Sequence, residues 1–165
     1  MLVILIIAGF FAAIFLIVTL VGILQPKTAS VQRSIIINAP REAVFPEVVS
    51  LRKLASWCAW GTRDPNMGQT FSGQDGTVGS TFYWNGNNTV GTGTMVMKAI
   101  DFGPRGKALS TLILDDFNGA TKVTWKFESD LGSPFRRALL TPMMKRLIIK
   151  DYDEGLRNLK AKLEA

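Results

Sequence analysis

The first 24 residues carry an unbroken apolar pattern that separates them from the rest of the chain. Between Leu2 and Leu24 there is no charged residue, and apart from Gly9, Thr19 and Gly22 every side chain is apolar. A helix of about twenty apolar residues crosses roughly 30 Å of hydrocarbon, so the pattern predicts an uncleaved transmembrane helix. A cleaved signal peptide fits less well, because no basic residue precedes the run and such leaders contain only about 7–15 apolar residues.

Alternating apolar and polar positions dominate the middle of the chain. In residues 121–128, Thr121, Val123, Trp125 and Phe127 share one face, and polar residues share the other. This alternation is typical of a strand with one buried and one solvated face. The predicted strands cover Val31–Ile37, Thr70–Gly73, Val78–Trp84, Asn88–Ile100, Lys107–Leu114 and Thr121–Ser129.

Turn residues between these strands indicate antiparallel hairpins. The turn dipeptides are Asp75-Gly76, Asn85-Gly86 and Asn118-Gly119. Each can supply the positive-φ residues that a tight hairpin requires. We therefore predict a tight turn at each of these dipeptides.

Two helical segments flank the predicted strands. Pro40, followed by an acidic residue in the first turn, marks a helix start, although Pro46 should shorten or kink this helix. Near the C-terminus, Ser133-Pro134 and Thr141-Pro142 offer two possible helix starts. The last segment carries one apolar stripe with helical spacing, formed by Leu140, Met144, Ile148, Tyr152, Leu156, Leu159 and Leu163.

The order of these elements predicts an α+β domain behind a membrane anchor. A strand and a helical region precede a run of antiparallel strands, and a long amphipathic helix closes the chain. This helix must bury its stripe, and the apolar face of the sheet is the available partner. We divide the chain into a transmembrane helix over residues 1–24, a linker over 25–30 and the domain over 31–165.

The distribution of charge predicts on which side of the membrane the domain lies and which classes of partner it binds. The chain has 19 Lys and Arg against 13 Asp and Glu, and the whole net charge of +6 follows the apolar segment. Lys27, Arg33 and Arg41 come after that segment and nothing basic precedes it, which places the domain in the cytoplasm. The basic residues are scattered, so we expect no nucleic acid partner, whereas anionic headgroups fit the excess. The sequence indicates no particular protein partner.

The residue inventory excludes several kinds of catalytic site. The chain has no His and a single Cys, Cys58, which excludes Cys/His zinc sites, an intrachain disulfide and Ser-His-Asp chemistry. We expect no metal, no cofactor and no catalytic set. Asp115 and Asp116 are adjacent on a predicted strand, so their side chains point to opposite faces and cannot act as an acid/base pair. One enzymatic route stays open, namely a lone carboxylate or Tyr83 with a shifted pKa in an apolar cavity.

Five segments, in order, carry a family resemblance. They are "RSIIINAPREAVFPEV", "WCAWGTRDP", "GTVGSTFYWNGNNTVGTGTM", "TKVTW" and "GLRNLKAKLE". From about Val31 to the C-terminus they resemble the SRPBCC superfamily, also called START-like or Bet v 1-like, and its bacterial branch labelled polyketide cyclase/dehydrase-like. Gly61-Thr62-Arg63 departs from that branch, where a Ser-Pro-Trp-like run places an aromatic residue at the cavity mouth.

The resemblance implies a helix-grip fold, in which a curved antiparallel sheet wraps around the C-terminal helix and encloses a hydrophobic cavity. Members of the superfamily bind lipids, sterols or polyketide-like molecules, and some act as cyclases or aromatases. An N-terminal transmembrane helix is a familiar attachment in this branch.

Large aromatic side chains indicate where a ligand would bind. Any one of them can be simple core, but several together suit an apolar pocket with deformable methionine lining. The candidate ligand-binding residues are Trp57, Trp60, Phe71, Tyr83, Trp84, Trp125, Phe127, Met144 and Ile148. Gly91 and Gly93 lead into a strand rather than a helix, so we do not interpret them as a phosphate-binding loop. We interpret them as positions without a side chain that leave space beside Trp84.

Three functions remain open from the sequence. The first, which the missing nucleophile–base set favours, is a membrane-anchored domain that binds a hydrophobic small molecule or lipid in an internal cavity. The second is a polyketide cyclase- or aromatase-like enzyme, which needs a polar residue such as Tyr83 or Asp64 in the cavity. The third is a protein-interaction domain with a closed cavity. The space between the sheet and the last helix around Met144–Tyr152 distinguishes them.

Overall fold

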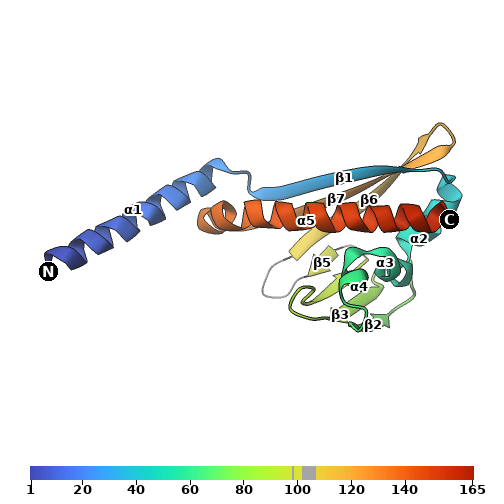
Figure 1. The fold of residues 1–165 in the computed structure, drawn as a ribbon, viewed down its shortest axis with the longest axis horizontal. Coiled ribbons are helices and arrows are strands. Elements are labelled where there is room, and N and C mark those ends of the chain that lie inside the picture. The colour runs from blue at the N-terminus through green and yellow to red at the C-terminus, as the bar shows by residue number, and fades with distance from the viewer. Residues whose placement is uncertain (98, 102–106) are drawn as a thin grey trace.

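The structure, a computed structural model, describes residues 1–97, 99–101 and 107–165. It consists of one projecting N-terminal helix and an α+β domain (Figure 1). The elements in chain order are α1 (Leu2–Leu24), β1 (Thr28–Ile37), α2 (Arg41–Val49), α3 (Leu51–Trp57), α4 (Ala59–Arg63), β2 (Gly68–Ser72), β3 (Thr81–Asn85), β4 (Thr92–Val96), β5 (Ala99–Asp101), β6 (Lys107–Phe117), β7 (Ala120–Asp130) and α5 (Pro134–Leu163).

The strands among the described residues form one antiparallel sheet of seven strands in the order β1-β7-β6-β5-β4-β3-β2. β1 pairs with β7 along its whole length, from Thr28 opposite Asp130 to Ile37 opposite Thr121. The long strands β1, β6 and β7 run beside α5, and the short strands carry the sheet toward α3 and α4 (Figure 1). The predicted α+β fold, a curved antiparallel sheet with a long C-terminal helix, is confirmed.

The connection between β3 and β4 differs from the prediction. Asn85-Gly86 does not form a two-residue turn, and the positive-φ residue of this connection is Gly91 (φ 72°). A longer loop closes through hydrogen bonds from the Gly86 amide to the Gly91 carbonyl (2.9 Å) and from the Gly91 amide to the Asn87 carbonyl (2.7 Å). The strand predicted over Asn88–Ile100 therefore begins only at Thr92. It is also divided into β4 and β5, and residue 98 lies outside the described residues.

Capping residues set the helix limits. α5 starts at the earlier of its two predicted positions, because Ser133 caps it and Pro134 occupies the first turn, and Pro142 lies inside the helix. Ser50 ends α2 and caps α3, accepting a hydrogen bond from the Lys53 amide (3.1 Å). Asp75 supports this corner by accepting hydrogen bonds from the Ser50 hydroxyl (2.5 Å) and the Leu51 amide (2.8 Å). Together these bonds fix the start of α3 against the connection between β2 and β3.

The core lies between β7 and the second half of α5. All four residues of the predicted apolar face of β7 are buried, as are Ile148, Tyr152, Leu156 and Leu159 of the predicted stripe. Leu140 and Met144, nearer the start of α5, are only partly buried. The first half of α5 therefore leaves the core, and this difference between its two halves positions the candidate site.

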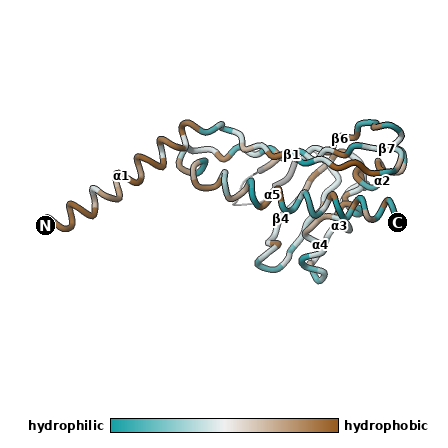
Figure 2. Tube along the Cα trace, turned by 45° about the horizontal axis from the view of Figure 1, so that its top comes forward, coloured by the Kyte–Doolittle hydropathy of each residue, from teal (hydrophilic) through white to brown (hydrophobic). Residues whose placement is uncertain are grey.

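α1 is hydrophobic along its length (Figure 2) and lies almost entirely outside the domain. Its 23 residues correspond to about 35 Å of helix. Among the described residues it is the one helix long and apolar enough to cross a membrane. Gly22 is its one buried residue, at the point where α1 meets the start of α5.

Candidate functional site

An aromatic cluster fills the centre of the space between the sheet and α5. Trp125 stacks on Tyr152 with ring centroids 3.9 Å apart, and the Trp57 ring meets Trp125 edge-on at 5.2 Å. The Ser110 hydroxyl accepts a hydrogen bond from Trp125 Nε1 (2.7 Å) and shares another with the Tyr152 hydroxyl (3.0 Å). Trp57, Trp125 and the neighbouring Phe127 are buried core residues, and none of them lines either of the pockets that flank this cluster.

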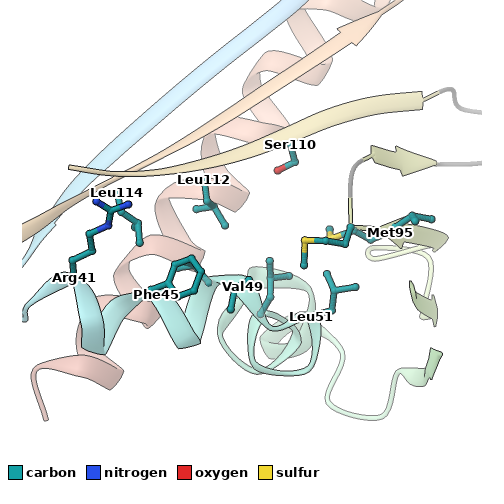
Figure 3. A pocket seen from close by; sticks show the side chains of 12 residues that line it. Arg41, Phe45, Val49, Leu51, Met95, Ser110, Leu112 and Leu114 are labelled. Atoms are coloured by element: carbon teal, nitrogen blue, oxygen red, sulfur yellow. The ribbon is translucent and has the colours of Figure 1, made fainter. Parts of the chain in front are cut away.

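One pocket, of about 270 Å³, lies between α2 and α3 on one side and β4 and β6 on the other. Figure 3 shows Phe45 and Val49 of α2 pointing toward Leu112 of β6, with Met95 of β4 beside them. Arg41 lies at one end of the pocket and is its charged lining residue. We call this the α2 pocket; none of the nine candidate residues lines it.

A second pocket, of about 480 Å³, lies between α4, the β3–β4 loop and the first half of α5. Four of the nine candidate residues line it, namely Trp60, Trp84, Met144 and Ile148. Its other apolar lining residues include Val90, Leu140, Met143 and Leu147, and its charged ones are Arg63, Arg136, Lys150 and Asp151. We call it the α5 pocket. It lies in the region around Met144–Tyr152, which distinguishes the three functions that the sequence leaves open. The apolar stripe of α5 leaves the core at this point.

The two remaining candidates, Phe71 and Tyr83, do not line either pocket. Phe71 stacks on Phe82 at 4.8 Å, and the Arg52 guanidinium lies over its ring at 4.6 Å. Tyr83 is 40% exposed and lies on the opposite face of β3 from Phe82 and Trp84, because side chains alternate along a strand. Sequence alternation alone could have separated Tyr83 from Trp84.

Trp84 forms the inner wall of the α5 pocket. Its ring is buried between Trp60, at 4.8 Å and nearly parallel, and Phe82, at 5.5 Å. Gly93 lies directly opposite Trp84 in the sheet, and a Cβ at Gly93 would come within 2.4 Å of Trp84 Cζ2. Glycine at 93 therefore leaves room on this face of the strand, and the ring of Trp84 itself occupies that room.

A polar cluster joins α4 to α5 at the pocket rim. Arg63 pairs with Asp151 (2.5 Å) and Glu154 (2.7 Å) on successive turns of α5. Asp151 also accepts a hydrogen bond from Trp60 Nε1 (3.3 Å), and Glu154 accepts one from the Thr62 hydroxyl (2.9 Å). This cluster could not be predicted from the sequence, because Arg63 and its partners are far apart in the chain. The cluster orients Trp60 for stacking on Trp84.

Opposing effects act on the pKa values of this cluster. Burial lowers the pKa of Arg63, but its hydrogen bonds with Glu154 and Asp151 outweigh burial and raise that pKa above its ordinary value. Burial likewise raises the pKa of Glu154, but hydrogen bonds from Arg63 and Thr62 outweigh it and lower that pKa below 4.5. The folded state therefore favours the ionised pair.

Acidification is expected to weaken the ion pair between Arg63 and Glu154 at the pocket rim. Because folding lowers the pKa of Glu154, its stabilising effect is complete above the ordinary value of 4.5 and is lost as pH falls through the lower folded-state pKa. We expect Glu154→Gln to have a lower Tm than the wild type at neutral pH, with the gap closing below about pH 4.5. Thermal unfolding of the full chain in detergent, repeated across this pH range, measures the Tm of the wild type and of the variant. Glu128→Gln is the matched control. A difference in Tm between Glu154→Gln and the wild type that stays constant down to about pH 3 would contradict the lowered pKa of Glu154 in the folded state.

Tyr83 and Asp64, the two polar residues named for the enzyme hypothesis, do not line the α2 or the α5 pocket; the carboxylate that lines the α5 pocket is Asp151, which is paired with Arg63. Asp64 accepts a hydrogen bond from the Asn87 amide (2.7 Å) and so holds the β3–β4 loop. Cys58 is buried, and burial raises the pKa of its thiol. Asp115 lies opposite Lys122 in the β6–β7 ladder. Within residues 1–97, 99–101 and 107–165, no group of three or more Cys, Asp and Glu side chains is arranged to hold a metal ion.

The chain shares its fold with several solved structures. A protein of Thermus thermophilus aligns with a TM-score of 0.60 at 14% identity, covering 81% of this chain and 96% of that one. The di-domain ARO/CYC StfQ from the steffimycin biosynthetic pathway aligns with a TM-score of 0.59 at 9% identity, covering 83% of this chain and 51% of StfQ. Ara h 8.0201 aligns with a TM-score of 0.59 at 10% identity, covering 82% of this chain and 97% of that one.

The sequence itself identifies the family. No protein with a curated description matches the chain. Residues 28–164, from β1 to the end of α5, match the family described as polyketide cyclase/dehydrase and lipid transport. The matched segment excludes α1 and includes every residue that lines the α5 pocket. The chain therefore belongs to the polyketide cyclase/dehydrase and lipid transport family.

Proposed function

We propose that this protein is a membrane-anchored domain that binds a hydrophobic small molecule or lipid in the α5 pocket. The observation that carries the proposal is the pocket itself, about 480 Å³ of mainly apolar space walled by Trp60, Trp84 and one flank of α5. Ligand sites are typically concave, mostly apolar and about 300–1,000 Å³ in volume, with few polar groups to orient the ligand. The family description, which includes lipid transport, supports the same class of ligand.

The α5 pocket suits this role better than the α2 pocket. The α2 pocket, at about 270 Å³, is smaller than a typical ligand site. The α5 pocket also carries an excess of positive charge, because Asp151 is engaged by Arg63 while Arg136 and Lys150 contribute two further cations. An apolar molecule with an anionic end fits both features.

We propose α1 as the anchor. It has the length and hydropathy of a membrane-spanning helix, and β1 begins at Thr28, only a few residues after α1 ends. The domain would therefore lie close to the bilayer. Lys27, Arg33 and Arg41 follow α1, which supports a cytoplasmic domain by the positive-inside tendency.

A pocket-filling variant tests the binding site. We expect Met144→Trp, in the full chain purified in detergent, to weaken binding of a fluorescent phosphatidylglycerol about tenfold or more, which corresponds to the loss of roughly 1.4 kcal/mol of contacts. The matched control is Ile113→Trp, an apolar position exposed on β6 outside both pockets. Mass spectrometry of organic extracts would identify lipid carried through purification. The proposal is wrong if the wild type neither retains lipid nor binds the probe saturably, or if Met144→Trp binds as the wild type does.

A further inference from the structure

The first half of α5 exposes a row of apolar side chains that the domain does not cover. The row consists of Phe135, Leu139, Met143 and Leu147, which are 38%, 51%, 52% and 52% exposed. Residues four apart on a helix lie one above the other on the same side. The four side chains therefore form a continuous strip about 18 Å long on the helix surface. We call this strip the α5 row.

The α5 row begins against the proposed membrane anchor. The Phe135 ring stacks on Phe15 of α1 with centroids 5.5 Å apart. Gly22 of α1 lies so close to Pro134 that a Cβ at Gly22 would come within 1.7 Å of the Pro134 carbonyl oxygen. These contacts, which only a glycine at 22 permits, hold the start of α5 beside the last turns of α1.

The position of Phe15 along α1 sets the depth of Phe135. Phe15 precedes the end of α1 at Leu24 by about 13 Å of helix. α1 is only slightly longer than the roughly 30 Å hydrocarbon layer that such a helix crosses. A spanning α1 therefore places Phe15 within the hydrocarbon layer, and its stacking partner Phe135 at the same level.

The other end of the α5 row reaches the α5 pocket. Met143 and Leu147 are both exposed and both line this pocket. The strip of apolar surface is thus continuous from the anchor to the ligand site. A lipid acyl chain following it would stay in contact with apolar side chains throughout.

Basic residues accompany the row. Arg136 and Lys150 line the pocket, and Lys145 and Arg146 lie between them on the exposed surface of α5. Within the described part of the chain, none of the four forms an ion pair. Cations next to an apolar helix surface are typical of segments that lie at an anionic membrane surface.

We propose that the start of α5 is inserted in the surface of the bilayer that α1 crosses, that the α5 row leads from there to the ligand site, and that the α5 pocket takes an anionic phospholipid directly from this bilayer along the row. This inference rests on the proposed function and adds the source of the ligand, its class and its route. The acyl chains follow the row toward Trp60 and Trp84, while Arg136 and Lys150 hold the anionic headgroup at the rim.

Spin-label depth measurements test the membrane position of the start of α5. The native Cys58 is buried, so single cysteines at Leu139, Ile14 and Ile113 can be labelled selectively. The full chain is reconstituted in vesicles of equal parts phosphatidylcholine and phosphatidylglycerol. We expect the labels at Leu139 and Ile14 to be more accessible to oxygen than to a water-soluble nickel complex, and the label at Ile113 to show the reverse.

Two glycine variants serve as a matched pair for this measurement. Gly22→Ala clashes with the Pro134 backbone, whereas Gly9→Ala in the same helix meets nothing within 4 Å. We expect Gly22→Ala to move the Leu139 label toward water and Gly9→Ala to leave it in place. A Leu139 label as exposed to the nickel complex as the Ile113 label overturns the inference. If the Ile14 label is then still more accessible to oxygen than to the nickel complex, the proposal that α1 is the membrane anchor is unaffected.

The rate of lipid uptake tests the α5 row as the route of entry, independently of binding in the α5 pocket. Fluorescent phosphatidylglycerol in the same vesicles is the probe, and Leu139→Asp is compared with Ile113→Asp. We expect Leu139→Asp to slow uptake about tenfold while leaving saturation in detergent unchanged, because Leu139 lies on the row but does not line the pocket. Equal uptake rates for the two variants overturn the route and leave the proposed function intact. A wild type that takes up no probe in vesicles or in detergent overturns both.

Discussion

Replacing Trp125 by alanine is expected to lower the free energy of unfolding by about 3–5 kcal/mol, the usual effect of truncating a large buried aromatic residue. Trp125 is buried, stacks on Tyr152 of α5 and meets the edge of Trp57 of α3. It therefore joins the sheet, α3 and the last helix in a single contact cluster. Alanine would leave a cavity at their junction and would also remove the indole that donates to Ser110.

Thermal unfolding of the full chain in detergent, followed by near-ultraviolet circular dichroism, measures this effect. The expected decrease in Tm is roughly 10–20 °C for a domain of this size. Trp125→Phe is the matched control, because it keeps an aromatic ring beside Tyr152 and loses the hydrogen bond to Ser110, and we expect it to cost less. If Trp125→Ala were no less stable than Trp125→Phe, the cluster would not be the centre of the core.

Gly93→Ala is expected to disrupt the α5 pocket and to cost about 1–3 kcal/mol of stability, as overpacking of a core does. The added Cβ would lie 2.4 Å from Trp84 Cζ2, a distance that real Cβ contacts do not show. The Trp84 ring has little freedom to move away, because Trp60 and Phe82 hold it on either side. Displacing it would break the Trp60–Trp84 stack that walls the pocket.

Urea unfolding and binding of fluorescent phosphatidylglycerol together measure this prediction. Gly68→Ala is the control, since it is also a strand glycine but its Cβ would meet only ordinary contacts, the nearest being the Asn85 carbonyl oxygen at 3.6 Å. We expect Gly68→Ala to stay within about 0.5 kcal/mol of the wild type and to bind the probe normally. Gly93→Ala with normal stability and normal binding would show that the Trp84 wall adjusts without loss.

Features that depend on local periodicity were predictable. The alternation of β7 predicted its buried face, and the helical spacing of Ile148, Tyr152 and Leu156 predicted the core-facing side of α5. Turn chemistry was less reliable. Asn118-Gly119 does form the positive-φ turn between β6 and β7, whereas Asn85-Gly86 does not, because the loop there closes through Gly91 and is held by Asp64 from a distant segment.

The candidate site could be predicted only in part. Aromatic composition indicated apolar space between the sheet and the last helix, but it could not separate rings that line a pocket from rings that fill the core. Trp84 lines the α5 pocket because Trp60 and α5 leave space beside it, whereas Trp125 is enclosed by Tyr152 and Trp57. That difference arises from partners far away in sequence, as does the pairing of Arg63 with Asp151 and Glu154.

The sequence by itself determined the apolar N-terminal helix, the antiparallel sheet and the family, because each is written in local hydrophobic periodicity or in an ordered series of short segments. Only the tertiary structure decided where space remains between the elements. Packing α5 along the sheet buries its second half, while its first half meets α1 and leaves the α5 pocket on its flank. The physical reason is that burial and cavities are properties of surfaces brought together across the whole chain, which no local pattern records.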